Sequence, residues 1–197
     1  MVLTSIVDES NFTGLYKFNK QGWQSLNVNN GAGEGEGYGG IQTTSADFAV
    51  GSLGLIGRFD GHKWGFSQLP EWGQVNLYGV SQQDNSVVAV GEYGLIALSS
   101  DTGRSWRSLN NSKENNTSNN TLYSCAINGA DIFIGGANGT FQIVSGDKEV
   151  SRIKIIGLRE SATIFSIYAQ DKIIVAAGGD NAGFNPFIVY RAYVERW

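Results

Sequence analysis

The sequence predicts an all-β protein, and two features of composition carry most of that prediction. Glycine accounts for 27 of the 197 residues and proline for only two, whereas an average chain has about 7 % glycine. Each interior glycine costs a helix about 1 kcal/mol, so this composition disfavours a helical bundle. A hydrophobic share of 41 % is too high for a disordered chain. Many short strands joined by glycine-containing turns fit both features.

An internal repeat is the third observation. The segment Phe48–Ile56 (FAVGSLGLI) recurs about 40 residues later as Val88–Ile96 (VAVGEYGLI). Further copies occur at Phe133–Phe141, more loosely at Val175–Gly178, and in part at Gly14–Phe18. The second glycine of each copy falls at positions 14, 54, 94, 139 and, by expectation, 183. A short apolar run with an aromatic residue precedes the copies, at 38–41, 77–80, 122–127 and 164–168.

The best-preserved repeat unit predicts four strands. They are Leu77–Val80, Val87–Val90, Leu95–Ser99 and a short strand around Trp106. Between the second and third lies the turn Gly91–Gly94, whose two glycines are expected to take the positive φ values of hairpin turns. Four short strands per repeat of this length are typical of a β-propeller blade.

The repeat therefore predicts a single β-propeller domain over residues 1–197, with about five four-stranded blades. The blades are expected at about 1–28, 38–70, 75–109, 121–157 and 162–197. The first is predicted to be incomplete, with strands at Val2–Val7, Gly14–Phe18 and Trp23–Leu26, and the outer strands of the last fall within Phe187–Trp197.

Two irregular segments between blades, Asn27–Gly40 and Leu109–Thr121, are predicted to be long loops. Such loops often carry binding residues, although tolerated insertions explain them equally well. The candidate interaction residues in the loops between blades are Glu34, Glu36, Tyr38, Trp72, Asn115 and Asn119. The segment Gly178–Gly183 is predicted to be an unusual turn, either a bulge or a ligand-contacting loop.

The turn Ser99–Trp106 (SSDTGRSW) matches the pattern Ser/Thr-x-Asp-x-Gly-x-x-Trp, known as an Asp-box. With Val87–Ile96 ahead of it, the segment resembles a blade of the Asp-box propellers, and is most similar to the photosystem II assembly and stability factor family. That family has longer, seven-bladed members. The resemblance implies structural roles for four residues. The side chain of Asp101 would cap the turn and Trp106 would pack between blades, with Ser99 and Gly103 completing the motif.

Shortened or partial versions of this turn occur elsewhere in the chain. The segment Phe59–Trp64 keeps only part of the pattern. Trp64 and Trp23 are expected to repeat the packing role of Trp106.

Catalytic chemistry has few candidates. His62 is the one histidine and Cys125 the one cysteine, so no His/Cys metal cluster is expected. Cys125 lies in an apolar run and is expected to be a small buried side chain. Paired carboxylates are the remaining alternative, since they hydrolyse glycosides. The acidic candidates mostly occupy predicted turns, where caps are the usual role: Glu34, Glu36, Asp60, Glu71, Glu92, Asp131, Asp180 and Glu195. We therefore predict a non-enzyme with no cofactor and no metal.

The charge and composition bear on partners. A net charge of −4 and a pI near 5.0 disfavour nucleic acid as a partner. No apolar stretch of about 18 residues occurs, so no membrane insertion is expected. The N-terminus lacks signal-peptide features, so the chain is expected to be cytoplasmic if it is not part of a virion.

A glycine-, asparagine- and serine-rich β protein with few Cys, His and Met is typical of phage virion components. The hypothesis is a structural interaction protein of a larger assembly, in a virion tail or on a capsid surface. Two alternatives stay open. One is a soluble assembly chaperone related to the photosystem II factors, and the other is a lectin-like propeller that binds a glycan.

Overall fold

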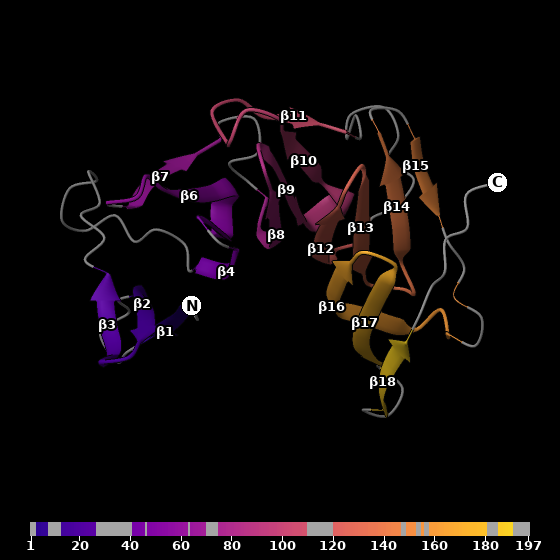
Figure 1. Ribbon diagram of the computed structural model, residues 1–197. Helices are drawn as coiled ribbons and strands as arrows, with labels where there is room; N and C mark the ends of the chain where they lie inside the picture. Colours follow the sequence, from indigo (N-terminus) through magenta and orange to yellow (C-terminus); the bar gives the residue numbers. More distant parts are fainter. Residues whose placement is uncertain are drawn as a thin grey trace. The chain divides into compact units, whose positions relative to one another are not determined.

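A computed structural model describes residues 3–7, 13–26, 41–45, 47–62, 64–69, 75–109, 120–146, 149–152, 155, 158–180 and 185–190. In these residues the chain forms five antiparallel sheets, and strands adjacent in sequence are adjacent in each sheet (Figure 1). The chain divides into two compact units, Met1–Leu77 and Tyr78–Trp197. Each unit is described by itself.

The first unit holds a three-stranded and a four-stranded sheet. The three-stranded sheet consists of β1 (Leu3–Val7), β2 (Thr13–Asn19) and β3 (Gly22–Leu26). The four-stranded sheet consists of β4 (Ile41–Ser45), β5 (Phe48–Gly51), β6 (Leu55–Phe59) and β7 (Trp64–Gln68), with the short helix η1 (Ser52–Gly54) between β5 and β6.

The second unit holds three sheets. The first strand of the first of these sheets, β8, starts at the boundary between the units. The first sheet contains β8 (Leu77–Gln83), β9 (Ser86–Gly91), β10 (Ile96–Ser99) and β11 (Arg107–Ser108), with η3 (Glu92–Gly94) between β9 and β10. The second contains β12 (Leu122–Asn128), β13 (Asp131–Gly136), β14 (Phe141–Ser145) and β15 (Glu149–Arg152). The third contains β16 (Ala162–Gln170), β17 (Ile173–Asp180) and β18 (Asn185–Tyr190).

The sheets of the second unit pack through two apolar clusters. One cluster contains Val88 and Val90 of β9 together with Leu122 of β12 and Ile132 and Ile134 of β13. In the other, side chains of β13 and β14 meet those of β16 and β17, among them Phe133, Phe141, Ile164 and Ile174. Burying apolar area contributes about 25 cal/mol per Å², so these faces are the main source of stability in this unit.

Cys125 lies inside the first cluster, as predicted. Its thiol donates a weak hydrogen bond to the Val88 carbonyl, with a sulfur–oxygen distance of 3.6 Å. Burial raises the pKa of the Cys125 thiol well above its usual range. The side chain therefore stays a neutral, small apolar group at every pH at which the fold persists.

The turn that links the second and third strands of a blade differs from the prediction at its first glycine. Gly51 and Gly91 are extended, with φ of −164° and −166°. The positive φ values fall instead on the last two residues of each turn. These pairs are Leu53 (56°) with Gly54 (69°), Tyr93 (56°) with Gly94 (70°), and Asn138 (55°) with Gly139 (63°). The expectation that both glycines adopt positive φ was wrong for the first one.

The first glycine of the turn is required by a lack of room for a side chain and not by its φ value. Gly136 pairs with Leu122 at the start of β12. A Cβ atom on Gly136 would lie 2.4 Å from the Thr121 carbonyl oxygen and 3.1 Å from the Leu122 Cα atom. Two backbones approach here more closely than any side chain permits.

The second glycine of the turn connects one sheet to the next segment of chain. The Gly54 N–H donates to the Val75 carbonyl at 2.7 Å, just before β8 begins. The Gly139 N–H donates to the Ala162 carbonyl at 2.6 Å, at the start of β16. Gly54 and Gly139 both have a positive φ in the conformation that makes this bond. The repeat in sequence is therefore also a repeat of this backbone hydrogen bond.

The last sheet corrects a second expectation. Gly178, Gly179 and Asp180 are not in a turn: they belong to β17 and pair with both β16 and β18. Residues 181–183, the rest of the predicted turn, lie outside the described residues, as do the predicted loop residues 27–40 and 110–119.

Gly136→Ala should lower the free energy of unfolding by about 2–3 kcal/mol, because the added methyl group meets backbone and not a flexible side chain. Urea unfolding followed by circular dichroism measures this change. Gly65→Ala is the matched control, since Gly65 also lies in a strand but a Cβ atom there would lie 4.0 Å from the Arg58 carbonyl oxygen. Equal effects of the two substitutions would contradict the close-approach account.

Tyr93→Asn should raise the free energy of unfolding by about 1 kcal/mol, because tyrosine pays for the left-handed conformation that asparagine tolerates. The Tyr93 side chain is 61 % exposed, so little packing is lost. The reverse exchange at the matching position, Asn138→Tyr, should lower it by more, because it also removes the hydrogen bond that the Asn138 amide donates to Asn120 Oδ1 at 2.7 Å. Thermal melting of both variants checks the pair, and changes of the same sign would contradict it.

Candidate functional site

The loop residues predicted to form an interaction site lie outside the described residues. They are Glu34, Glu36, Tyr38, Trp72, Asn115 and Asn119. Four of the acidic candidates also lie outside the described residues: Glu34, Glu36, Glu71 and Glu195. The structure therefore places only the Ser99–Trp106 turn, the remaining carboxylates and the strands around them.

The turn Ser99–Trp106 folds around two side chains. Ser99 is buried, and its hydroxyl accepts the Gly103 N–H at 2.8 Å and the Asp101 N–H at 3.3 Å. The same hydroxyl donates to the Asp101 carboxylate at 2.8 Å. Thr102 and Gly103 take positive φ values of 59° and 77°, which reverse the chain.

Asp101 closes the second half of this turn. One carboxylate oxygen accepts the backbone N–H groups of Arg104 at 3.0 Å and Ser105 at 2.9 Å. The other accepts the Ser105 hydroxyl at 2.6 Å. The hydrogen bonds from Ser105, followed by that from Ser99, hold the pKa of Asp101 well below its usual range. The carboxylate is occupied by its own turn, which is the arrangement of a capping residue.

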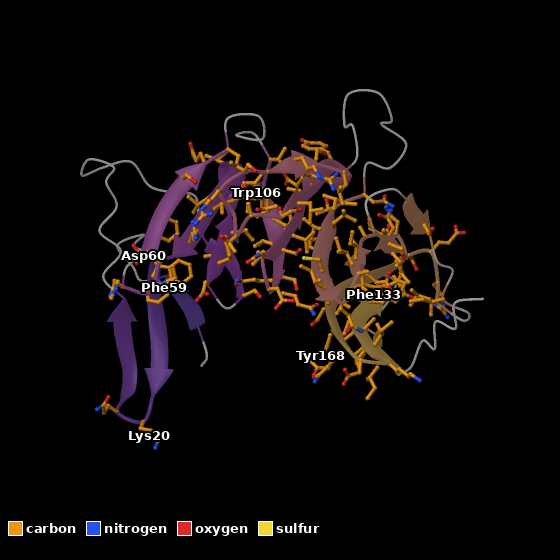
Figure 2. The ribbon with its side chains drawn as sticks, turned by 45° about the horizontal axis from the view of Figure 1, so that its top comes forward. Lys20, Phe59, Asp60, Trp106, Phe133 and Tyr168 are labelled. Carbon is orange, nitrogen blue, oxygen red and sulfur yellow. The ribbon has the colours of Figure 1, made fainter. Side chains whose placement is uncertain are left out.

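The tryptophans predicted to pack between blades differ from one another. Trp64 is buried, and its ring lies 5.6 Å from the ring of Phe59 and 6.1 Å from that of Phe66, both in the same sheet. Trp106, labelled in Figure 2, is half-buried. The side chain of Trp23 lies outside the described part of the chain. The shortened turn before Trp64 keeps one cap, because Asp60 accepts the His62 N–H at 2.8 Å.

The other described acidic candidates also bond to nearby side chains. Asp131 accepts the Ser145 hydroxyl at 2.7 Å. Asp180 is buried and accepts the Ser161 hydroxyl at 2.7 Å and the Arg159 guanidinium at 3.1 Å. Within the described ranges, no group of three or more His, Cys, Asp or Glu side chains is arranged to hold a metal ion.

Sequence reasoning missed a row of aromatic rings on the first strands of three sheets. Tyr78 of β8, Tyr123 of β12 and Phe165 of β16 form a ladder, which we call the aromatic strip. Its ring centroids are 5.3 Å apart between Tyr78 and Tyr123 and 5.5 Å apart between Tyr123 and Phe165. Phe165 is 55 % exposed, and the two tyrosines are half-buried. The signal was present in the sequence, because each apolar run before a repeat contains an aromatic residue.

One carboxylate accompanies the aromatic strip. The Tyr78 hydroxyl donates to Glu92 Oε1 at 3.1 Å, and η3, which contains Glu92, lies against β12. The elements β8, η3, β12 and β16 contain no lysine or arginine, and Glu92 is their one charged residue. The strip is therefore an apolar surface with a negative end.

Among the described residues, no helix is long and apolar enough to cross a membrane.

Comparison with solved structures identifies the fold as that of the β-propellers. The computationally designed protein Ika4 matches with a TM-score of 0.59 and 17 % identity, over 86 % of this chain and 99 % of that one. YCF48 bound to a D1 peptide matches with a TM-score of 0.56 and 14 % identity, over 79 % of this chain and 55 % of that one. YCF48 from Cyanidioschyzon merolae matches with a TM-score of 0.51 and 12 % identity, over 76 % of this chain and 53 % of that one.

This chain thus spans about half the length of the YCF48 structures. No family model matches the sequence, and no curated protein matches it.

Asp101→Asn should lower the Tm by a few degrees at pH 7. The lowered pKa means that the folded state favours the carboxylate, so its stabilising effect is full above the unfolded pKa of about 3.9 and is lost as the pH falls below it. The gap in Tm between parent and variant should therefore narrow from pH 4 downward.

Melting curves between pH 7 and pH 2 measure that gap. Asp84→Asn is the control, since Asp84 is an exposed turn residue in the same sheet, and it should keep the acid dependence of the parent. A gap of constant size at all pH values would show that Asp101 contributes by shape and not by charge.

Proposed function

We propose that this chain is a non-enzymatic protein-interaction propeller that works within a larger assembly. The observation that carries the proposal is the exposure of large apolar side chains on the first strands and turns of the second unit. Tyr93, Phe165, Tyr168 and Ile173 are each more than half exposed. Large apolar side chains exposed on one unit support an interaction surface there.

The carboxylates support the same proposal. Asp101, Asp131 and Asp180 each bind side chains or backbone groups of their own sheet, so their described role is to hold turns and strand ends. We also propose that Ser99–Trp106 is an Asp-box, since Ser99, Asp101 and Gly103 make the contacts that the motif requires of them. A motif used for folding leaves recognition to other surfaces.

The finer proposal is a phage virion protein of the tail or capsid surface, and it rests on composition. A soluble assembly chaperone is the second candidate. The peptide-bound structure of YCF48 favours it, because a protein of this fold there holds a D1 peptide. A glycan-binding lectin is a third, supported by the exposed aromatic rings.

Fractionation of the cells that encode the chain tests the proposal. Particles and membrane complexes are separated on a density gradient, and the chain is quantified in each fraction by mass spectrometry. We expect a fixed ratio of this chain to the structural proteins of a particle. Enrichment with a membrane complex during its assembly would favour the chaperone. A chain found free of every assembly would contradict the proposal.

A further inference from the structure

We propose that the aromatic strip binds an arginine side chain of a protein partner, with Glu92 as the counter-charge. This inference rests on the proposed interaction function and names the chemistry of its binding surface. It concerns Tyr78, Tyr123 and Phe165, three rings contributed by three successive sheets of one compact unit.

The positions of the rings point to a use beyond folding. Tyr123 and Phe165 sit at β-bulges, where the pairing with the neighbouring strand skips a residue. A bulge turns a side chain away from the alternation of the strand and commonly occurs beside functional sites. The four-stranded sheet of the first unit has the same bulge, and there the residue is Gln42. The bulge therefore tolerates a polar residue, so aromatic rings at the other positions are not a requirement of the blade.

The charge of the strip selects a cation. Aromatic faces carry the negative part of the ring quadrupole, and a guanidinium group lying on such a face is attracted to it. The Glu92 carboxylate stands at the Tyr78 end and accepts the Tyr78 hydroxyl. Since β8, η3, β12 and β16 contain no lysine or arginine, these elements supply no positive charge of their own to the strip. A guanidinium group suits both features, because it is planar enough to lie on a ring face and has several N–H groups that can donate to a carboxylate.

The tilt of the rings disfavours a sugar as the occupant. Neighbouring planes are inclined by 46° between Tyr78 and Tyr123 and by 52° between Tyr123 and Phe165. Neither pair of neighbouring rings therefore offers a common plane on which two successive sugar units would stack. A single guanidinium needs one ring face and a nearby carboxylate, and the exposed Phe165 ring adds apolar contact for the rest of the partner.

Titration of the full, isotope-labelled chain tests the inference. The probes are N-acetyl-arginine amide, the matched N-acetyl-norleucine amide and the neutral sugar cellotriose, followed by NMR on the aromatic ring signals. We expect saturable shifts at Tyr78 and Tyr123 with the arginine probe alone. Tyr123→Leu and Glu92→Gln should each weaken that binding about fivefold.

Tyr168→Leu is the matched control. Tyr168, labelled in Figure 2, lies on β16 and is 55 % exposed like Phe165, but it is not part of the strip. It should bind the arginine probe as the parent does, whereas Phe165→Leu should bind more weakly. Circular dichroism melting shows that each variant is folded before it is titrated.

Three results would overturn the inference. The first is that cellotriose shifts the ring signals and the arginine probe does not, and the second is that none of the three probes shifts them. The third is that Tyr168→Leu and Phe165→Leu lose equal affinity for the arginine probe. Failure of the proposed function is a separate result. A chain that co-fractionates with its assembly but does not bind the arginine probe would refute only the proposed binding of arginine by the aromatic strip. A chain that binds arginine but joins no assembly would refute the interaction role in an assembly.

Discussion

The fold depends on the close approach of backbones where one sheet follows another. At Gly136 the neighbouring carbonyl of Thr121 leaves no room for a Cβ atom. At Gly139 the N–H donates to the start of the next sheet, and this requires a left-handed turn whose third residue also has a positive φ. A sequence can meet all these demands with few residues other than glycine. In the second unit, part of the glycine excess is thus a consequence of the close approach of successive sheets.

The same close approach makes the first strands of the second unit a rigid group. A Cβ atom at Gly79 of β8 would lie 3.0 Å from the Tyr123 carbonyl oxygen of β12. Serine hydroxyls bridge the same strands: Ser81 accepts the Ile127 N–H at 3.1 Å, and Ser124 accepts the Ile167 N–H at 2.8 Å. Side chains on these strands are therefore held at fixed separations. Rings on these strands lose little conformational entropy when a partner binds, which is the advantage of preorganisation.

The sequence predicted the fold more fully than it predicted the site, for a physical reason. Repeated glycines and apolar runs are imposed by the backbone, so the phase of the repeat was visible and the propeller class followed from it. The role of the first glycine of the turn was misjudged because two different requirements both select glycine. One is a lack of room for a Cβ atom, and the other is a positive φ. Gly178–Asp180 was misplaced because glycine also occurs inside strands, and here the two glycines pair with both neighbouring strands. The aromatic strip was overlooked because its rings look like core residues in sequence, and the register shifts at Tyr123 and Phe165 appear only in the strand pairing.

The distribution of aromatic residues separates the requirements of folding from those of recognition. Where the fold demands an aromatic side chain, as at the buried Trp64, the ring is enclosed by neighbours such as Phe59 and Phe66. Where the fold does not demand one, as at the bulge, one sheet carries Gln42 while others carry rings that remain partly exposed. The residue at a position that varies between repeats with the same backbone is therefore not determined by the backbone. In a repeat protein, then, the departures from the repeat are the better guide to function, and the repeat itself is the better guide to structure.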